Sequence, residues 1–266
     1  MNLYIIPTGG LCNRMRAMAS GISIAKKQGL KSVVFWNNSQ GLRADFNQLF
    51  LPVDDNQIEI VENRKWLYNI DNTKDYLKRY IPLHILYKST YNYNIYNNNE
   101  KEFEISPVKK NLLISCNSMS PHYFQLEKLF KPQTHLQQRI DQITAVFPHN
   151  IFGVHIRRTD NAESIKRSPI EAFINIIQTE IDKDDTAMFY LATDDNNVKQ
   201  QLKHLFSTHI ITYLDDTSRN TLEGMEFAIV DLFCLSKTSK IIGSGYSSYS
   251  HIAAEIGGIE IEYAKA

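Results

Sequence analysis

The chain has 266 residues, of which 43% are apolar and 22% are charged, so it can bury the core of one large domain or two small ones. Lys and Arg together number 29, and so do Asp and Glu. This balance excludes a protein whose binding to nucleic acid or membrane rests on an overall basic excess. Any anionic ligand must therefore be met by a local cluster of basic residues.

The cysteines Cys12, Cys116 and Cys234 lie far apart and form neither a CxxC pair nor a Cys/His ligand spacing. We therefore expect no zinc site and no disulfide framework, which fits a reducing compartment. The opening MNLYIIPTGG lacks the pattern of a signal peptide, and no apolar run approaches the length of a membrane span. We predict a cytoplasmic protein without an integral membrane segment, and the wealth of Asn, Ile, Lys and Tyr favours a bacterial source.

The first half of the chain begins as an αβ domain. The apolar run at 3–7 predicts a strand, TGGLCN at 8–13 predicts a glycine turn, and 14–28 predicts a helix with Gly29 as its C-cap. The remaining predicted elements are strands at 31–36, 58–61 and 111–116, an exposed polar loop at 91–100, and a helix at 135–147 that leads into a second domain.

The second half alternates strands and helices. Ser168 and Glu171 form a capping box at the start of its first helix, and Val198, Leu202 and Leu205 are expected on the buried side of its second. This βαβαβαβαβ order predicts a parallel sheet with helices on both faces. The predicted strands are 151–156, 187–193, 209–214, 240–245 and 259–263, and the predicted helices are 168–181, 196–206, 222–238 and 247–257.

Polar residues follow four of these strands, where each strand ends. They are RRTD at 157–160, TDD at 193–195, LDD at 214–216 and GSGYSS at 243–248. The carboxyl ends of parallel strands lie at one edge of the sheet, and that edge is where ligands bind in such folds. The sequence therefore predicts a binding site built from these loops.

Two adjacent arginines end the first of these strands. Because side chains alternate along a strand, His155 and Arg157 point to one face and Arg158 to the other. We predict that Arg157 binds an anion, since its planar guanidinium suits phosphate, and that Arg158 pairs with an internal acid and holds the turn. A structural ion-pair turn is the alternative.

The glycine turn after the first strand is a second candidate. Gly9 and Gly10 let the backbone approach a ligand, and Asn13 is a candidate helix cap. Arg14 follows in the first helical turn, where the helix dipole disfavours a cation, so we expect a bound anion or an acidic partner beside it. A plain tight turn is the alternative.

Several acids are candidates with competing interpretations. Asp194 and Asp195 can bind a metal, sugar hydroxyls or a base, or one of them can cap the helix that follows, and nothing about their spacing demands a metal. Asp231 lies inside an apolar helix, where an unpaired carboxylate is costly. We expect it to face solvent, a ligand or an arginine such as Arg219.

Ser247 and Ser248 begin the last helix, directly after a glycine-containing turn. Free amides and hydroxyls at a helix N-terminus form a ready phosphate site. A serine N-cap is the alternative, and the two interpretations are compatible.

Four stretches together resemble the motifs of the GT-B fucosyltransferase superfamily. They are GGLCNR at 9–14, HIRRTD at 155–160, ATDD at 192–195 and GYSSYSHIAAE at 245–255. The superfamily includes the α1,6-fucosyltransferases with the bacterial nodulation enzymes, the α1,2-fucosyltransferases and the protein O-fucosyltransferases. The α1,6/nodulation branch is the most similar, because RRTD and LATDD occur together. Residues 54–110 show no clear match.

The resemblance implies an α/β, GT-B-like fold with two Rossmann-like domains and a cleft between them. The acceptor-side αβ domain would span 1–148, and the nucleotide-sugar domain, with a parallel sheet, would span 149–266. The implied activity is inverting, metal-independent transfer of fucose from GDP-fucose to a glycan hydroxyl, without a cofactor. A glycosyltransferase with another nucleotide sugar and a non-catalytic nucleotide- or glycan-binding relative are the alternatives. The compact chain favours a role in polysaccharide biosynthesis.

The resemblance also implies roles for single residues. His155 and Asp231 would contact guanine, while Arg157 would hold the β-phosphate and stabilise the leaving GDP. Glu163 resembles, with a one-residue gap, the general base of the α1,6 branch. Asp194 or Asp195 would complete the nucleotide pocket with Ser247 and Ser248, and Asn13 would close around the fucose. The remaining candidate substrate-binding residues are Gly10, Arg14, Arg158, Asp160 and Arg219.

Overall fold

The computed structural model describes residues 1–39, 41–62, 67–92, 110–117, 125–215 and 218–265. The chain forms two compact units, Met1–Gln133 (unit 1) and Thr134–Ala266 (unit 2). The division lies earlier than residue 148, because helix α5 (Thr134–Thr144) packs against helix α9 (Leu222–Leu235) of unit 2. Within the described ranges, no helix combines the length and the apolar character needed to cross a membrane.

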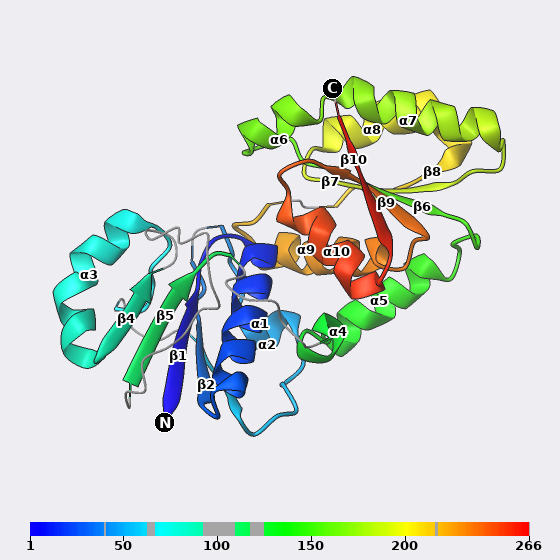
Figure 1. The fold of residues 1–266 in the computed structure, drawn as a ribbon. Helices are drawn as coiled ribbons and strands as arrows, with labels where there is room; N and C mark the ends of the chain where they lie inside the picture. Colours follow the sequence, from blue (N-terminus) through cyan, green and yellow to red (C-terminus); the bar gives the residue numbers. More distant parts are fainter. Residues whose placement is uncertain (40, 63–66, 93–109, 118–124, 216–217, 266) are drawn as a thin grey trace. The chain divides into compact units, whose positions relative to one another are not determined.

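Unit 1 is a parallel sheet with the strand order β3-β2-β1-β5-β4 (Figure 1). The predicted strands of this half are confirmed, and one further strand, β4, was not predicted. The strands are β1 (Asn2–Pro7), β2 (Lys31–Trp36), β3 (Ile58–Glu62), β4 (Ser89–Asn92) and β5 (Lys110–Ser115), and the helices are α1 (Leu11–Lys27), α2 (Phe46–Leu49), α3 (Thr73–Leu86) and α4 (Leu126–Leu129).

Helix α1 shows how a glycine turn is used. Gly9 has φ +80°, a left-handed conformation that suits glycine, and the helix starts at Leu11 with Gly10 at the N-cap. The predicted capping by Asn13 is therefore wrong, because the helix begins two residues before it. At the other end Gly29 has φ +65°, which confirms its predicted role in ending the helix.

The middle of unit 1 departs most from the sequence prediction. Tyr91 and Asn92 belong to β4, and the rest of the predicted loop at 91–100 lies outside the described residues. Helix α3 was not predicted, because Pro82 interrupts its pattern. It begins where the Asn72 side chain accepts a hydrogen bond from the Asp75 amide (3.1 Å).

Unit 2 is the predicted parallel sheet, with the strand order β10-β9-β6-β7-β8. The strands are β6 (Phe152–Ile156), β7 (Phe189–Thr193), β8 (Ile210–Ile211), β9 (Lys240–Ser244) and β10 (Glu260–Ala264). Besides α5 and α9, the helices are α6 (Ala162–Arg167), α7 (Ile170–Lys183), α8 (Asn196–Phe206) and α10 (Ser248–Gly257), with one 3-10 turn at Ser207–His209.

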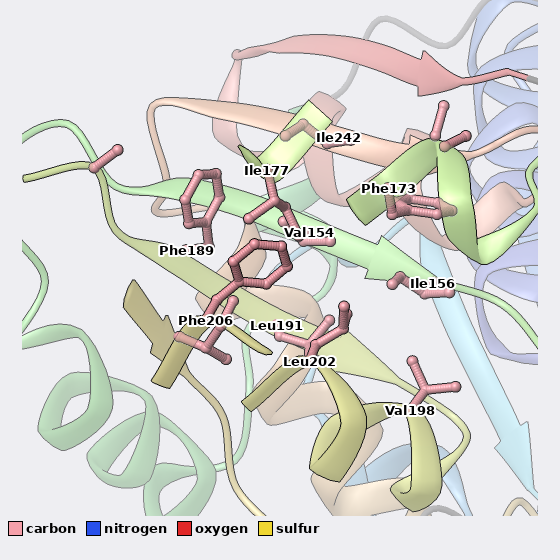
Figure 2. Packing of buried hydrophobic residues seen from close by; sticks show 14 residues of the cluster. Val154, Ile156, Phe173, Ile177, Phe189, Leu191, Val198, Leu202, Phe206 and Ile242 are labelled. Carbon is pink, nitrogen blue, oxygen red and sulfur yellow. The ribbon is translucent and has the colours of Figure 1, made fainter. Parts of the chain in front are cut away.

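One face of this sheet packs against α7 and α8 through an apolar core (Figure 2). The labelled side chains come from β6, β7 and β9 and meet those of the two helices: Val154, Ile156, Phe189, Leu191, Ile242, Phe173, Ile177, Val198, Leu202 and Phe206. Burying such apolar side chains is the main source of the unit's stability. Because Val154 and Ile156 face this core, His155 between them faces the opposite side of the sheet.

Three local predictions in unit 2 are wrong. The predicted strand at 209–214 shortens to β8, and Leu205 is 51% exposed while Phe206 is buried in its place. Ser168 does not cap α7, whose N-cap is Pro169. The Ser168 hydroxyl instead donates to the Ala264 carbonyl oxygen and accepts from the Gly245 amide (2.9 Å), so a tertiary bond replaces the local one.

Candidate functional site

The polar loops of unit 2 meet at one edge of its sheet. The register pairs Ile156 of β6 with Thr193 of β7, and His155 with Gly243 of β9, so the loops that follow these strands are neighbours. The predicted cluster at 214–216, after β8, does not join them in the same way. Asp215 forms an ion pair with Arg139 of α5 (2.5 Å), and Asp216 lies outside the described residues.

Asp194 organises the turn after β6. Its carboxylate accepts hydrogen bonds from the Arg158 amide (2.8 Å), the Thr159 amide (3.2 Å) and the Thr159 hydroxyl (2.7 Å). Burial raises the pKa of Asp194, but the Arg157 charge and these bonds lower it more, and the net pKa lies below its ordinary value. Asp195 is the residue that caps α8, accepting from the Asn197 amide (2.8 Å), as the capping alternative predicted.

Arg157 stands at the centre of a charged cluster. One Nη atom lies 2.8 Å from the Asp194 carboxylate, the other contacts Asp160, and its backbone amide donates to the Ser244 hydroxyl (2.9 Å). The side chain keeps 17% of its surface exposed. Two carboxylates and one backbone bond therefore fix a guanidinium that still reaches solvent. These contacts match the ion-pair alternative, and anion binding by Arg157 stays a prediction.

Arg219 completes this cluster rather than pairing with Asp231, which corrects the sequence expectation. Its guanidinium contacts the other oxygen of Asp160, so one carboxylate lies between Arg157 and Arg219. Burial first, and the nearby Arg157 charge second, lower the pKa of Arg219 to about 10. Ser218, next to Arg219, packs closely on the first turn of α9. Only glycine fits at position 224, since a Cβ there would lie 2.0 Å from the Ser218 carbonyl oxygen.

Arg158 points to the other face of the sheet, as the alternation predicted. Its guanidinium donates to the Ser168 carbonyl oxygen (2.9 Å) and lies 5.9 Å from the centre of the Phe173 ring. The expected direct pairing with an acid is replaced by this carbonyl contact, while Asp194 and Glu171 act on the Arg158 charge from a distance. Arg158 therefore holds the turn onto α7, and these contacts do not place it in the Arg157 cluster.

His155 is buried beside α10. Its Nδ1 lies 2.7 Å from the Ser250 hydroxyl, and its ring stacks on Tyr249 with the ring centres 4.7 Å apart. Gly243 allows this approach, since a Cβ there would lie 2.7 Å from the Ser250 Cβ. Burial is the main cause that lowers the pKa of His155 to about 3; Asp194 opposes this shift and the Arg157 charge adds to it. The ring is therefore neutral at physiological pH, and its contact with guanine stays a prediction.

Asp231 is buried in a cluster that the sequence did not reveal. The Tyr190 hydroxyl donates to its carboxylate (2.5 Å), and the buried Lys199, which donates to the Tyr213 carbonyl oxygen (2.8 Å), acts on it electrostatically. Burial raises the pKa of Asp231 to about 6, and Lys199 lowers it. The polar ends of Tyr190 and Lys199, within an apolar strand and an amphipathic helix, were the available sequence clues.

The acid sensitivity of unit 2 tests the state of His155. Between its ordinary pKa of 6.5 and about 3, the unfolded chain binds a proton that the folded chain does not. Stability from this group is complete above pH 6.5 and falls as the pH drops toward 3, by at most ~1.4 kcal/mol per pH unit. Since Asp231 is present in both proteins, comparing His155→Gln with the wild type isolates the histidine.

We expect the free energy of unfolding of His155→Gln to fall less than that of the wild type across this window. Urea unfolding followed by circular dichroism at pH 6.5 and at two more acidic values measures it. His204→Gln, at an exposed histidine of α8, is the matched control and should follow the wild type. Parallel curves for wild type and His155→Gln would contradict the neutral, buried ring.

The start of α10 is the third part of the edge. Ser247 occupies the N-cap position but makes no side-chain capping hydrogen bond, so the simple capping alternative is wrong. Tyr246 before it has φ +62°, a strained conformation for a side chain other than glycine, and its carbonyl oxygen accepts from the Asn161 side chain (3.2 Å). Through this bond the turn before α10 contacts the loop after β6, and Ser247 and Ser248 are half-buried.

Glu163 lies in the first turn of α6, whose N-cap Asn161 accepts from the Ser164 amide (3.0 Å). Its carboxylate is 50% exposed and lies 3.6 Å from Arg167. Its ion-pair partner Arg167 is itself exposed. The role of Glu163 as a base stays a prediction.

The glycine turn of unit 1 holds Arg14 inside the protein. The guanidinium is 1% exposed and donates to four acceptors: Gly9 O (2.7 Å), Asn37 O (2.5 Å), Ser39 Oγ (2.6 Å) and Asp71 Oδ1 (3.1 Å). Burial lowers the pKa of Arg14 to about 10, and Asp71 raises it. The acidic partner that the sequence required is Asp71, and direct ligand binding by Arg14, one of our candidates, has no support in these contacts.

Asn13 and Gly10 stay candidates at the same turn. The Asn13 side chain lies over Gly9, where a Cβ would approach its Nδ2 to 2.9 Å, and it is half-buried. Gly10 has an extended conformation with φ −74°. The turn therefore presents the polar side chain of Asn13 beside two glycines, and the Arg14 guanidinium holds it by donating to the Gly9 carbonyl oxygen.

No protein-family model matches the chain. Among solved structures it is similar to the fucosyltransferase NodZ from Bradyrhizobium, with 18% identity, a TM-score of 0.61, and coverage of 95% of this chain and 92% of that one. A NodZ α1,6-fucosyltransferase crystal soaked with GDP-fucose gives 19% identity and a TM-score of 0.62, covering 96% of this chain and 92% of that one.

Two further neighbours come from other branches. FUT1 of Arabidopsis thaliana, in complex with GDP, is 12% identical with a TM-score of 0.59, covering 98% of this chain and 69% of that one. POFUT1 in complex with GDP is 10% identical with a TM-score of 0.58, covering 98% of this chain and 97% of that one. The expected α/β fold is confirmed: two units with parallel five-stranded sheets, in the fold of the GT-B fucosyltransferases.

Proposed function

We propose that the protein is a glycosyltransferase that moves fucose from GDP-fucose to a hydroxyl of a glycan acceptor. The observation that carries the proposal is the cluster of Arg157, Asp160 and Arg219 at the ligand-binding edge of the unit 2 sheet. The fold likeness to fucosyltransferases with GDP or GDP-fucose supports the donor class.

The arginines suit the charge of the leaving group. When the glycosidic bond to GDP breaks, negative charge grows on a β-phosphate oxygen, and donors already in place stabilise that charge without reorganisation. Arg157, oriented by Asp194 through one Nη group, would offer the diphosphate the other Nη group, which now contacts Asp160. A diphosphate would take over the position of the Asp160 carboxylate between Arg157 and Arg219, and the amides at the start of α10 would add further donors.

The same donors offer a physical basis for the proposed metal-independent reaction. Two arginines can carry the compensating charge that a divalent cation supplies in other nucleotide-sugar enzymes. Inversion by single displacement needs a base for the acceptor hydroxyl, and Glu163 is the proposed group. For the guanine, the neutral His155 and the carboxylate of Asp231 are the proposed contacts. The cytoplasmic, bacterial setting and the role in polysaccharide biosynthesis stay predictions.

A binding panel tests the donor. We expect calorimetric titration to give an affinity for GDP-fucose and GDP at least about ten-fold higher than for UDP-sugars, because a site that bonds one base leaves polar groups unpaired with another. GDP-mannose reports on the sugar. Equal or tighter binding of a UDP-sugar would overturn the guanine assignment.

The non-catalytic alternative is separated by a second measurement. A glycosyltransferase releases GDP from GDP-fucose slowly to water without an acceptor, and faster with a suitable glycan. Release above the uncatalysed rate supports the enzyme. GDP-fucose binding with no release in either condition favours the binding protein.

A further inference from the structure

Helix α3 of unit 1 presents an apolar ridge to solvent. Leu77, Ile81 and Ile85 are spaced by four residues, so they lie on one face of the helix, and they are 63%, 70% and 79% exposed. Tyr80, also exposed, flanks Leu77 on the helix surface. A contiguous row of large exposed apolar side chains on a helix marks an interaction surface.

The ridge is not needed to hold α3 in place. The opposite face of the helix buries Tyr76 and Leu83 in the core that covers the unit 1 sheet, with Tyr87 just beyond the helix. Arg79 anchors the same side by donating to the Asn69 carbonyl oxygen (2.8 Å). The apolar ridge therefore lies on the outward half of a helix that is already fixed to its sheet. Figure 1 shows this helix beside β4.

Basic side chains alternate with the ridge. Lys74 and Lys78 are exposed, and at 100° per residue they lie on the same outward half of α3 as Ile81 and Ile85. Lys88 follows directly after the helix and is also exposed. The single acid of α3, Asp75, is half-buried at the margin of this surface, three residues before Lys78, and lies 3.9 Å from Arg79. The surface formed by the ridge and these lysines, which we call the α3 face, is both apolar and positively charged.

We propose that the α3 face binds the surface of an anionic lipid bilayer, with the helix lying parallel to the membrane. Leu77, Ile81 and Ile85 would enter the boundary between headgroups and acyl chains. The lysine stems would lie along that apolar layer while their ammonium groups reach lipid phosphates. This charge complementarity favours an anionic membrane over an apolar protein partner. The proposal goes beyond the proposed activity and does not depend on it.

Vesicle co-sedimentation of the full chain tests the α3 face. We expect the protein to sediment with vesicles of phosphatidylcholine and phosphatidylglycerol but not with phosphatidylcholine alone, and added salt should weaken binding. The double variant Ile81→Asn/Ile85→Asn should lower the partition coefficient about ten-fold or more, and Lys74→Ser/Lys78→Ser should remove most of the salt dependence. These side chains are exposed, so circular dichroism should show unchanged folding.

The matched control is Val146→Asn/Leu205→Asn, which removes two exposed apolar side chains of unit 2 and should bind vesicles like the wild type. The absence of binding to the anionic vesicles, or an equal loss in the control, would overturn the proposal. So would a dimer in light scattering that Ile81→Asn/Ile85→Asn splits, since a second copy would then cover the face.

Discussion

The Arg157→Ala variant is expected to lose fucosyl transfer almost completely while it keeps its fold. Removing one preorganised donor to a developing charge lowers kcat by about 10²–10³-fold. The fold should survive, because the Arg158 and Thr159 bonds to Asp194 continue to hold the turn. GDP release from GDP-fucose measures the rate, and the thermal unfolding temperature reports the fold.

Two further variants sharpen this experiment. Arg157→Lys keeps the charge but loses the planar fork, so we expect an intermediate rate. Lys203→Ala removes an exposed cation from the last turn of α8 and should leave the rate unchanged. A rate of Arg157→Ala within about two-fold of the wild type would contradict the mechanism, because the guanidinium would then not stabilise the charge on the leaving phosphate.

The Arg14→Met variant is expected to destabilise unit 1 by about 3–5 kcal/mol. Methionine fills a similar volume, but it leaves Asp71 and the carbonyl oxygens of Gly9 and Asn37 without the donor that now satisfies them. Urea unfolding followed by tryptophan fluorescence reports on unit 1, because Trp36 is buried there and the second tryptophan of the sequence, Trp66, also lies between residues 1 and 133.

The result also separates two roles for Arg14. If Arg14 only braces the turn, its replacement lowers stability and changes donor affinity little at temperatures where the protein stays folded. If Arg14 binds the ligand, its replacement lowers donor affinity and changes stability little. Lys128→Met, at an exposed lysine of unit 1, is the control and should change stability by less than about 0.5 kcal/mol. A stable Arg14→Met protein that no longer binds the donor would show that Arg14 is a ligand-binding residue and not only a structural one.

Patterns with a fixed period predicted the parts of the site that depend on one strand. Alternation along β6 correctly placed His155 and Arg158 on opposite faces of the sheet, since the apolar core around Val154 and Ile156 fixes the register. The βα order likewise brought the loops after β6, β7 and β9 to one edge. These predictions needed no knowledge of distant residues.

Predictions about single partners were less successful, because tertiary contacts choose them. Arg14 finds its acid 57 residues away, and Asp231 finds Tyr190 41 residues away. Ser168 had the local chemistry of an N-cap, yet its hydroxyl bonds Ala264 and Gly245 from later parts of the chain. Local propensity is a weak prior that such contacts override.

The three strands that carry the candidate site, β9, β6 and β7, are the inner strands of their sheet, whereas β10 and β8 form its edges. Each inner strand is hydrogen-bonded on both sides, so it opens only after a neighbour has separated. Fraying at β10 therefore leaves the loops around Arg157 assembled, whereas fraying at β8 reaches Arg219 in the segment that follows it. We expect a partial loss of binding to report melting of the β8 edge, and a complete loss to report melting of the inner strands.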